Sequence, residues 1–263
     1  MNLPAVRNIG GITLPTSTGV ALGRSAVTQA AVDSGGDMPT RVSVLGPINK
    51  FEIGGGGDAE GERFDELTDV VISAVIIQRQ MFPQPYKPGE NNEPICRSAN
   101  ALVGFPDTEK FDYETYAPQS DPGAVAVECS KCTAKDWNGS EKPPCADKFR
   151  LVFNAAQSED VLSMTVGGAS YVNIRDYLQS FGDDEPYWST EAKFTLEHIQ
   201  NAGSFYSKIH FAKTGEVPES EWGDYAQQAE KWLPFYADWI PRELKDQMSA
   251  NAEVVDAKVI SEG

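Results

Sequence analysis

The segment LTDVVISAVIIQRQ, residues 67–80, contains the longest apolar stretch in the chain, Val70 to Ile77, which is broken only by Ser73. Its composition and length predict a long central strand. Shorter segments of similar character predict further strands at residues 41–45, 48–53, 148–154, 160–166, 192–199 and 204–211. We therefore expect a mainly β protein of the α+β class.

Two short helices are expected beside these strands. The first begins after Ser170 and ends at Gly182, and the second begins near Glu219. In both segments apolar residues recur at the three- and four-residue spacing of one helix face. Ser170 is suited to be an N-cap, because its hydroxyl can satisfy a backbone amide at the start of a helix.

The chain is acidic, with 39 Asp and Glu against 22 Lys and Arg and a formal net charge of −17. Such a charge favours solubility and argues against indiscriminate nucleic-acid binding, but it leaves room for a locally basic groove. No stretch is apolar for the roughly 18 residues that span a membrane, and no signal-peptide pattern begins the chain. We expect a cytoplasmic protein, in the host cytoplasm if it is viral.

Composition divides the chain into three regions. Residues 1–38 are rich in small and polar residues and are expected to form a flexible N-terminal arm. Residues 39–214 hold the predicted strands, and within them residues 89–146 contain all four cysteines but little hydrophobic periodicity. This insertion lacks the apolar mass to fold alone and needs a covalent or metal staple. Residues 215–263 form an acidic C-terminal helix and tail.

The four cysteines predict a metal site. Cys129 and Cys132 are separated by two residues, which lets both thiolates bind one tetrahedral ion, while Cys96 and Cys145 complete a four-thiolate set. Two disulfides, a redox Cys-x-x-Cys pair, an iron centre and four unrelated thiols are the alternatives. We favour structural Zn²⁺, since four thiolates leave no open coordination position for catalysis.

The sequence predicts no enzyme. It contains no P-loop, dinucleotide fingerprint or nucleophile elbow, and Ser170 after two glycines is better explained as an N-cap than as a nucleophile. The predicted strands do carry bases beside aromatics, which could meet phosphates and stack on unpaired bases. A solvated strand face over core aromatics is the alternative. The candidate DNA-contacting residues are Lys50, Phe51, Arg79, Phe82, Tyr86, Arg97, Lys148, Arg150, Tyr206 and Lys208.

From about residue 41 to 213, the chain resembles a family of tailed-bacteriophage proteins described as single-stranded DNA-binding proteins. The landmarks are Leu67-Thr-Asp-Val-Val-Ile72, Phe82 with Tyr86, Cys96-Arg-Ser-Ala-Asn-Ala-Leu-Val-Gly104, Cys129-Ser-Lys-Cys132, Cys145, Phe149-Arg-Leu-Val-Phe153, Ser170, Trp188 and Tyr206. Ala101 departs from the family pattern, which usually has glycine there.

The resemblance implies an OB-like five-stranded barrel with a zinc-stapled insertion. It also implies single-stranded DNA binding in phage DNA replication or recombination, with protein partners recruited through the acidic C-terminal region. The chain lacks a terminal aromatic anchor for such recruitment. Two other functions stay open: a zinc-stapled interaction module for phage replication or host factors, and a metal-dependent nuclease.

Overall fold

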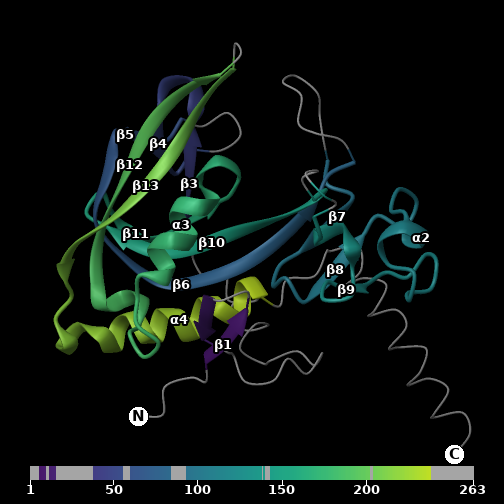
Figure 1. Cartoon of the computed structure of the whole chain (residues 1–263). Helices are drawn as coiled ribbons and strands as arrows, with labels where there is room; N and C mark the ends of the chain where they lie inside the picture. The colour runs from purple at the N-terminus through teal and green to yellow at the C-terminus, as the bar shows by residue number, and fades with distance from the viewer. Residues whose placement is uncertain are drawn as a thin grey trace, which may run out of the picture. The chain divides into compact units, whose positions relative to one another are not determined.

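The computed structural model describes residues 6–9, 12–15, 38–55, 60–83, 93–137, 139, 143–201 and 204–237 (Figure 1). The described residues fall into two compact units. Unit 1 is formed by residues up to Ile77 together with Asp147–Ala237, and unit 2 is formed by Gln78–Ala146. The predicted insertion was placed at residues 89–146, whereas unit 2 begins eleven positions earlier, inside the longest strand.

Unit 1 is built on a large mixed sheet. Its strands are β3 (Thr40–Leu45), β4 (Lys50–Ile53), β5 (Glu62–Phe64), β6 (Glu66–Met81), β10 (Cys145–Ala155), β11 (Ser158–Val166), β12 (Thr190–Asn201) and β13 (Ser204–Glu216). They follow the order β5-β4-β3-β11-β10-β6, and β12 joins the start of β6 and pairs with β13. The β3–β11 pair is parallel. The other strand pairs whose register is resolved run antiparallel.

Strand β6 confirms the prediction made from residues 67–80. Its central part, from Val70 to Ile77, is buried, because β-branched side chains on both faces pack against covering elements. The strand belongs to unit 1 up to Ile77 and to unit 2 from Gln78 onward. In unit 2 the sheet continues through β7 (Cys96–Ser98), β8 (Val103–Pro106) and β9 (Val127–Glu128).

Both predicted helices are present in unit 1. Helix α3 spans Tyr171–Gln179, and α4 spans Trp222–Ala237. Ser170 precedes α3 but does not cap it with its side chain, because its hydroxyl oxygen accepts a hydrogen bond from the Ile209 backbone N–H at 2.9 Å. The residue predicted as a cap therefore ties α3 to strand β13.

Helix α4 lies along one face of the sheet in unit 1 (Figure 1). Trp232 and Tyr236 on this helix pack against Val152 of β10 and against Ala74 and Ile76 of β6. The Arg150 guanidinium lies 4.8 Å from the centroid of the Tyr236 ring. The face of β10 that carries Arg150 and Val152 was a candidate DNA-binding surface, and in the structure it is covered by this helix.

The mainly β, α+β prediction is confirmed, but the predicted barrel is not found. Barrel closure requires the two outermost strands to pair. Among the described residues the sheet is open, since β5 ends its order on one side and β9 ends it on the other. The sequence pattern located the strands but does not encode which edges meet, and the five-stranded barrel that the resemblance implied is not found among the described strands.

Near the N-terminus, β1 (Val6–Ile9) and β2 (Ile12–Pro15) form a two-stranded antiparallel ribbon. The rest of the predicted flexible arm up to residue 37 lies outside the described residues, as does the predicted acidic tail after residue 237. Within the described part of the chain, no helix has the length and apolar character needed to cross a membrane.

Candidate metal centre

Unit 2 has a small apolar core of its own, which surrounds the cysteines. Its buried members are Met81, Ile95, Phe111, Tyr113, Ala117, Val127, Cys132 and Ala134, with Cys96 and Cys145 packed against them. The Tyr113 hydroxyl donates to the Ala124 carbonyl at 2.7 Å. So small a core contributes little folding free energy, which is the situation in which a structural metal is typically found.

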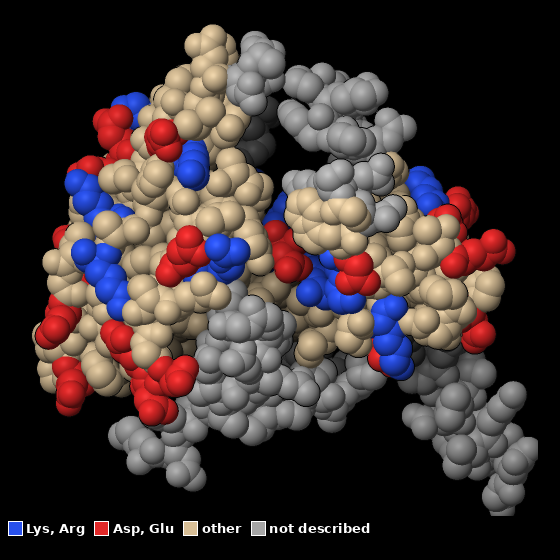
Figure 2. All heavy atoms as spheres, viewed as in Figure 1, with Lys and Arg blue, Asp and Glu red and all other residues tan. Residues whose placement is uncertain are grey.

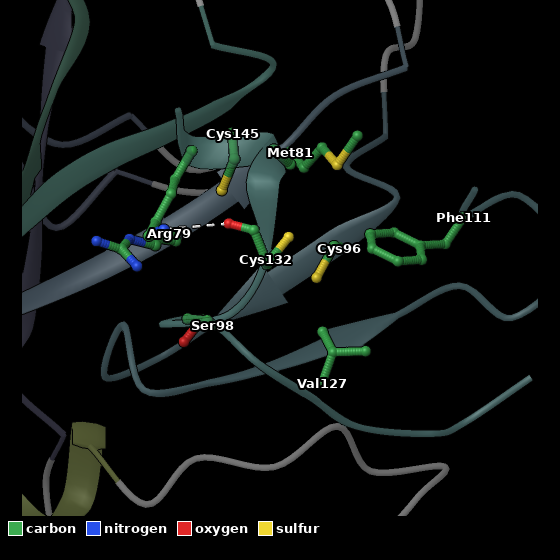
Figure 3. A pocket seen from close by; sticks show the side chains of 11 residues that line it. Arg79, Met81, Cys96, Ser98, Phe111, Val127, Cys132 and Cys145 are labelled. Atoms are coloured by element: carbon green, nitrogen blue, oxygen red, sulfur yellow. Dashed lines mark hydrogen bonds between the residues drawn. The ribbon is translucent and has the colours of Figure 1, made fainter. Parts of the chain in front are cut away.

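The four predicted ligands line one cavity. Cys96 begins β7, Cys129 directly follows β9, Cys132 precedes the short 3-10 helix η2 (Thr133–Lys135), and Cys145 begins β10. The cavity between them measures about 20 Å³. Figure 3 shows the sulfurs of Cys96, Cys132 and Cys145 lying close together in it. Folding thus brings together thiols that are separated by up to 49 positions in the chain (145 − 96).

Gly104 in β8 lets two of these thiols approach each other. A Cβ atom at this position would lie 3.0 Å from the Cys96 Sγ and 3.5 Å from the Cys129 Sγ. The two sulfurs are therefore at most 6.5 Å apart, the sum of those distances. The backbone of β8 can pass this close because glycine has no side chain to occupy the space.

The turn from Ser98 to Val103 is bonded to Cys129 through its backbone. The Asn100 side-chain oxygen accepts hydrogen bonds from the backbone N–H groups of Leu102 and Val103, at 2.9 and 3.2 Å. The Leu102 carbonyl in turn accepts the Cys129 N–H at 2.9 Å. Ala101 has φ = 57°, a left-handed conformation that favours glycine.

The electrostatics of the cavity are those of clustered thiols. Burial raises the pKa of Cys96, and the neighbouring Cys129, Cys145 and Cys132 raise it further. Burial also raises the pKa of Cys129, although hydrogen bonds from Ser98 and Arg79 and the charge of Arg79 oppose this. A metal ion that binds here must therefore displace protons from the thiols, so binding should strengthen as pH rises.

The chemistry of the residues fits Zn²⁺, but the positions of the side chains do not yet form a coordination shell. No disulfide joins the four cysteines, and the cavity is sized for a single small occupant. Within the described residues, however, no group of three or more potential ligands stands in a metal-binding arrangement. Coordination would require the thiols to draw closer together than they stand.

Several candidate DNA contacts do not lie on an open surface. Phe51 is completely buried in unit 1, so its predicted role in stacking on bases is wrong. Lys50, its neighbour, forms an ion pair with Asp65. Lys148 is half-buried, and burial lowers its pKa. The Arg150 guanidinium lies over the Tyr236 ring of α4. For Phe51, Lys148 and Arg150 the cause is that a short alternating strand does not reveal which of its faces will be covered, whereas Lys50 is partly exposed but already paired with a carboxylate.

The remaining candidates are divided between the units. In unit 2, Arg79 lines the cysteine cavity, Phe82 is half-buried and Arg97 is exposed. Tyr86 lies outside the described residues. In unit 1, Tyr206 is exposed and Lys208 half-buried on β13. The structure therefore does not gather the predicted contacts within either unit into one surface, and only Tyr206 with Lys208 combines an exposed aromatic ring with a nearby base.

Two further residues of the same hairpin were missed. Phe205 is exposed, and its ring stacks on that of His198 at a centroid distance of 5.4 Å. The signal was available in the sequence, because two consecutive aromatics stand near the start of the predicted strand at residues 204–211, and neighbouring strand residues point to opposite faces. On the face of the molecule in Figure 2, basic and acidic side chains are interspersed, and the described residues in this view form no continuous basic groove.

The comparisons with known proteins add nothing to this geometry. No protein-family model, no curated protein and no solved structure matches the chain. A function must therefore be proposed from the residues and their arrangement, with the phage resemblance as an additional expectation.

Proposed function

We propose that this chain is a non-catalytic protein that binds single-stranded DNA through the β12–β13 hairpin, with a zinc-bound four-cysteine centre stabilising unit 2. The observation that carries the DNA proposal is the exposure of two consecutive aromatic rings near the hairpin turn. Phe205 is 49% exposed and Tyr206 is 37% exposed. Exposed rings of this kind offer stacking platforms for unpaired bases, whatever the sequence of the DNA.

The hairpin presents these rings in two directions. Phe205 lies on one face with His198, and Tyr206 lies on the opposite face, across from Ile199. Lys208 shares the Tyr206 face, because side chains two positions apart in a strand point the same way. Its cross-strand neighbour Glu197 is hydrogen-bonded to His210 at 2.8 Å. Tyr206 and Lys208 thus supply a ring for a base and an ammonium group for a phosphate.

The zinc part of the proposal concerns stability and not catalysis. With all four thiols bound, the ion has no open position for a substrate or an activated water. Its contribution is to hold the loop connections of unit 2 together, since metal-binding free energy at such a site is folding free energy. The resemblance to phage proteins supports DNA replication or recombination as the setting, with partner proteins as a further expectation.

The test is fluorescence anisotropy of a labelled oligo-dT at low salt, with the full chain. We expect saturable binding, and we expect Phe205→Ala and Tyr206→Ala each to raise Kd by about 5- to 150-fold, which corresponds to roughly 1–3 kcal/mol per stacked base. Trp137→Ala is the matched control, because Trp137 is an exposed aromatic in unit 2. Absence of saturable binding at tens of micromolar would refute the function, and unchanged binding in both hairpin variants would refute the site.

One observation favours a second candidate, a protein-interaction module. Trp137 is 67% exposed and Val125 is 49% exposed, both in unit 2. Exposed large apolar side chains of this kind can anchor a protein partner. Capture of a replication or host protein by the wild type and not by Trp137→Ala, with no DNA binding, would favour this candidate. The nuclease alternative stays a prediction: no group of three or more ligands in the described part of the chain, whether carboxylates, histidines or cysteines, stands in a metal-binding arrangement, and no other observation favours it.

A further inference from the structure

The turn between β3 and β4 lies against the strand that carries the two exposed rings. This turn is the short 3-10 helix η1 (Gly46–Ile48), and it contacts β13. A Cβ atom at Gly46 would lie 3.3 Å from the Tyr206 Cα, 3.6 Å from the Phe205 carbonyl oxygen and 3.6 Å from the Ser207 backbone nitrogen. Because glycine has no side chain, the backbone of η1 can pass close to the backbone of residues 205–207.

Asn49, the residue that follows η1, is hydrogen-bonded to both strands of the β12–β13 hairpin. Its Oδ1 accepts from the Ser207 Oγ at 2.7 Å, and its Nδ2 donates to the Leu196 carbonyl at 3.4 Å. Its backbone N–H donates to the Gly46 carbonyl at 3.3 Å. Asn49 has φ = 54°, a left-handed conformation that asparagine adopts more readily than most residues with a side chain. One side chain thus joins the turn to the hairpin beside the rings.

The hairpin needs such a contact because its outer part leaves the sheet. Among the described residues, β12 pairs with β6 only from Ala192 to Thr195, whereas its pairing with β13 continues to Asn201. A two-stranded ribbon on its own is only marginally stable in water. Ile209 is held from α3 by the Asn173 Nδ2, which donates to its carbonyl at 2.7 Å. The hydrogen bonds of Asn49 hold the next part of the hairpin, toward the rings.

We infer that Asn49 is a positioning residue of the DNA site. Its two side-chain hydrogen bonds fix the segment that carries Phe205 and Tyr206, so that the rings are ordered before DNA arrives. A side chain that is already ordered loses less conformational freedom on binding. This role rests on the proposed function, because it concerns the same hairpin, and it explains how the rings are kept in place without touching the DNA itself.

The experiment compares the full-length wild type with Asn49→Gly, Ser207→Ala and Ala101→Gly. Asn49→Gly permits the left-handed backbone and removes both side-chain hydrogen bonds. Ala101→Gly is the matched control, because Ala101 is also left-handed, with φ = 57°, but belongs to unit 2. Fluorescence anisotropy measures the Kd for labelled oligo-dT at low salt. Hydrogen exchange with mass spectrometry measures the protection of the backbone amides in residues 204–209, and circular dichroism checks folding.

We expect Asn49→Gly to raise Kd by about 2- to 13-fold, which corresponds to an ordering cost of about 0.5–1.5 kcal/mol for one side chain. Amide exchange in residues 204–209 should be faster in this variant. Ser207→Ala should shift both readouts in the same direction but less, because the bond from Asn49 to Leu196 remains. Ala101→Gly should match the wild type.

A wild-type Kd in a folded Asn49→Gly variant would overturn the inference. If Asn49→Gly does not fold, Ser207→Ala decides: a raised Kd with faster exchange supports the inference, and a wild-type Kd overturns it.

A double-mutant cycle separates positioning of the rings from a general loss of stability. Asn49→Gly is also made in the Tyr206→Ala background. If Asn49 acts by holding the rings, part of its effect disappears with the Tyr206 ring, so the fold-change in Kd should be smaller there than in the wild type. The same fold-change in both backgrounds would show that Asn49 acts independently of Tyr206, and it would overturn the inference.

These outcomes are distinguishable from failure of the proposed function. If the wild type does not bind oligo-dT, the DNA function is refuted and the role of Asn49 falls with it. If the wild type binds and Tyr206→Ala weakens binding, while Asn49→Gly binds as the wild type does, the DNA site stands and only the role of Asn49 is refuted.

Discussion

Replacing Gly104 with alanine should disturb the cysteine cavity. The new Cβ would lie 3.0 Å from the Cys96 Sγ, 3.3 Å from the Val127 Cγ2 and 3.5 Å from the Cys129 Sγ. The first two distances are shorter than ordinary van der Waals contacts. Since these neighbours come from β7 and β9, which flank β8 on either side, relief requires movement of a cysteine or of a strand.

The expected magnitude follows from two opposing effects. Overpacking a close-packed site by one methyl group costs about 1–3 kcal/mol. Alanine also restricts the unfolded chain relative to glycine, which returns about 0.4–1 kcal/mol. We therefore expect Gly104→Ala to lower the free energy of unfolding by up to about 2.6 kcal/mol, and the midpoints of the two ranges give a loss of about 1.3 kcal/mol. It should weaken zinc binding as well, because the displaced sulfurs are predicted ligands.

Urea unfolding of the zinc-loaded and chelated protein, followed by circular dichroism, measures both effects. Gly223→Ala is the matched control, since a Cβ at Gly223 in α4 meets no atom within 4 Å. Because Gly223 is the second residue of α4, Gly223→Ala should stabilise by no more than the roughly 0.5–1 kcal/mol found in the middle of a helix. If Gly104→Ala is as stable as the wild type and binds zinc equally well, the proposed close approach of Cys96 and Cys129 at β8 is incorrect.

Three further predictions concern other parts of the fold. Trp232→Ala should lower the free energy of unfolding by about 3–5 kcal/mol, because it removes a large buried side chain between α4 and β10. Gln227 is exposed on the same helix, so Gln227→Ala should stay within about 0.5 kcal/mol of the wild type. Equal losses of stability in the two variants would contradict this packing. Ala101→Gly should leave stability unchanged or raise it by up to about 1 kcal/mol, because it relieves the left-handed φ, whereas a clear loss in thermal denaturation would argue against that conformation. Burial raises the pKa of Tyr187 from 10.0 to about 12. The contribution of the protonated Tyr187 to stability is therefore complete below pH 10 and is lost as the pH rises from 10 to 12. The denaturation midpoint should fall less steeply with pH over this range in Tyr187→Phe than in the wild type, and parallel plots of midpoint against pH would refute the shift.

Much of the local structure could be predicted from the sequence because it depends on periodicity. The β-branched segment at residues 67–80 and the helical spacing after Ser170 and Glu219 correspond to β6, α3 and α4. The grouping of the cysteines was also predictable, since a poorly apolar segment with four thiols has few ways to fold. The cavity they share agrees with that expectation, while the presence of a metal stays a prediction.

Long-range pairing could not be predicted in the same way. Arg150 and Val152 alternate with buried residues as a solvated strand face would, yet α4 covers them from about eighty positions later in the chain. Phe51 alternates between two charged neighbours, and nothing local indicates that its face is the covered one. Barrel closure failed for the same reason, because the pairing of strand edges depends on contacts distant in sequence.

The central claim is that Cys96, Cys129, Cys132 and Cys145 bind a single metal ion together. Native mass spectrometry of the purified full chain, with elemental analysis for zinc, tests it most directly. We predict one zinc ion per wild-type chain, and loss of stable zinc binding in each of the four single Cys→Ser variants, because a structural site needs its complete set of ligands. A wild-type chain that contains no zinc after expression in zinc-supplemented medium, or a Cys129→Ser variant that keeps its zinc and its stability, would contradict the claim.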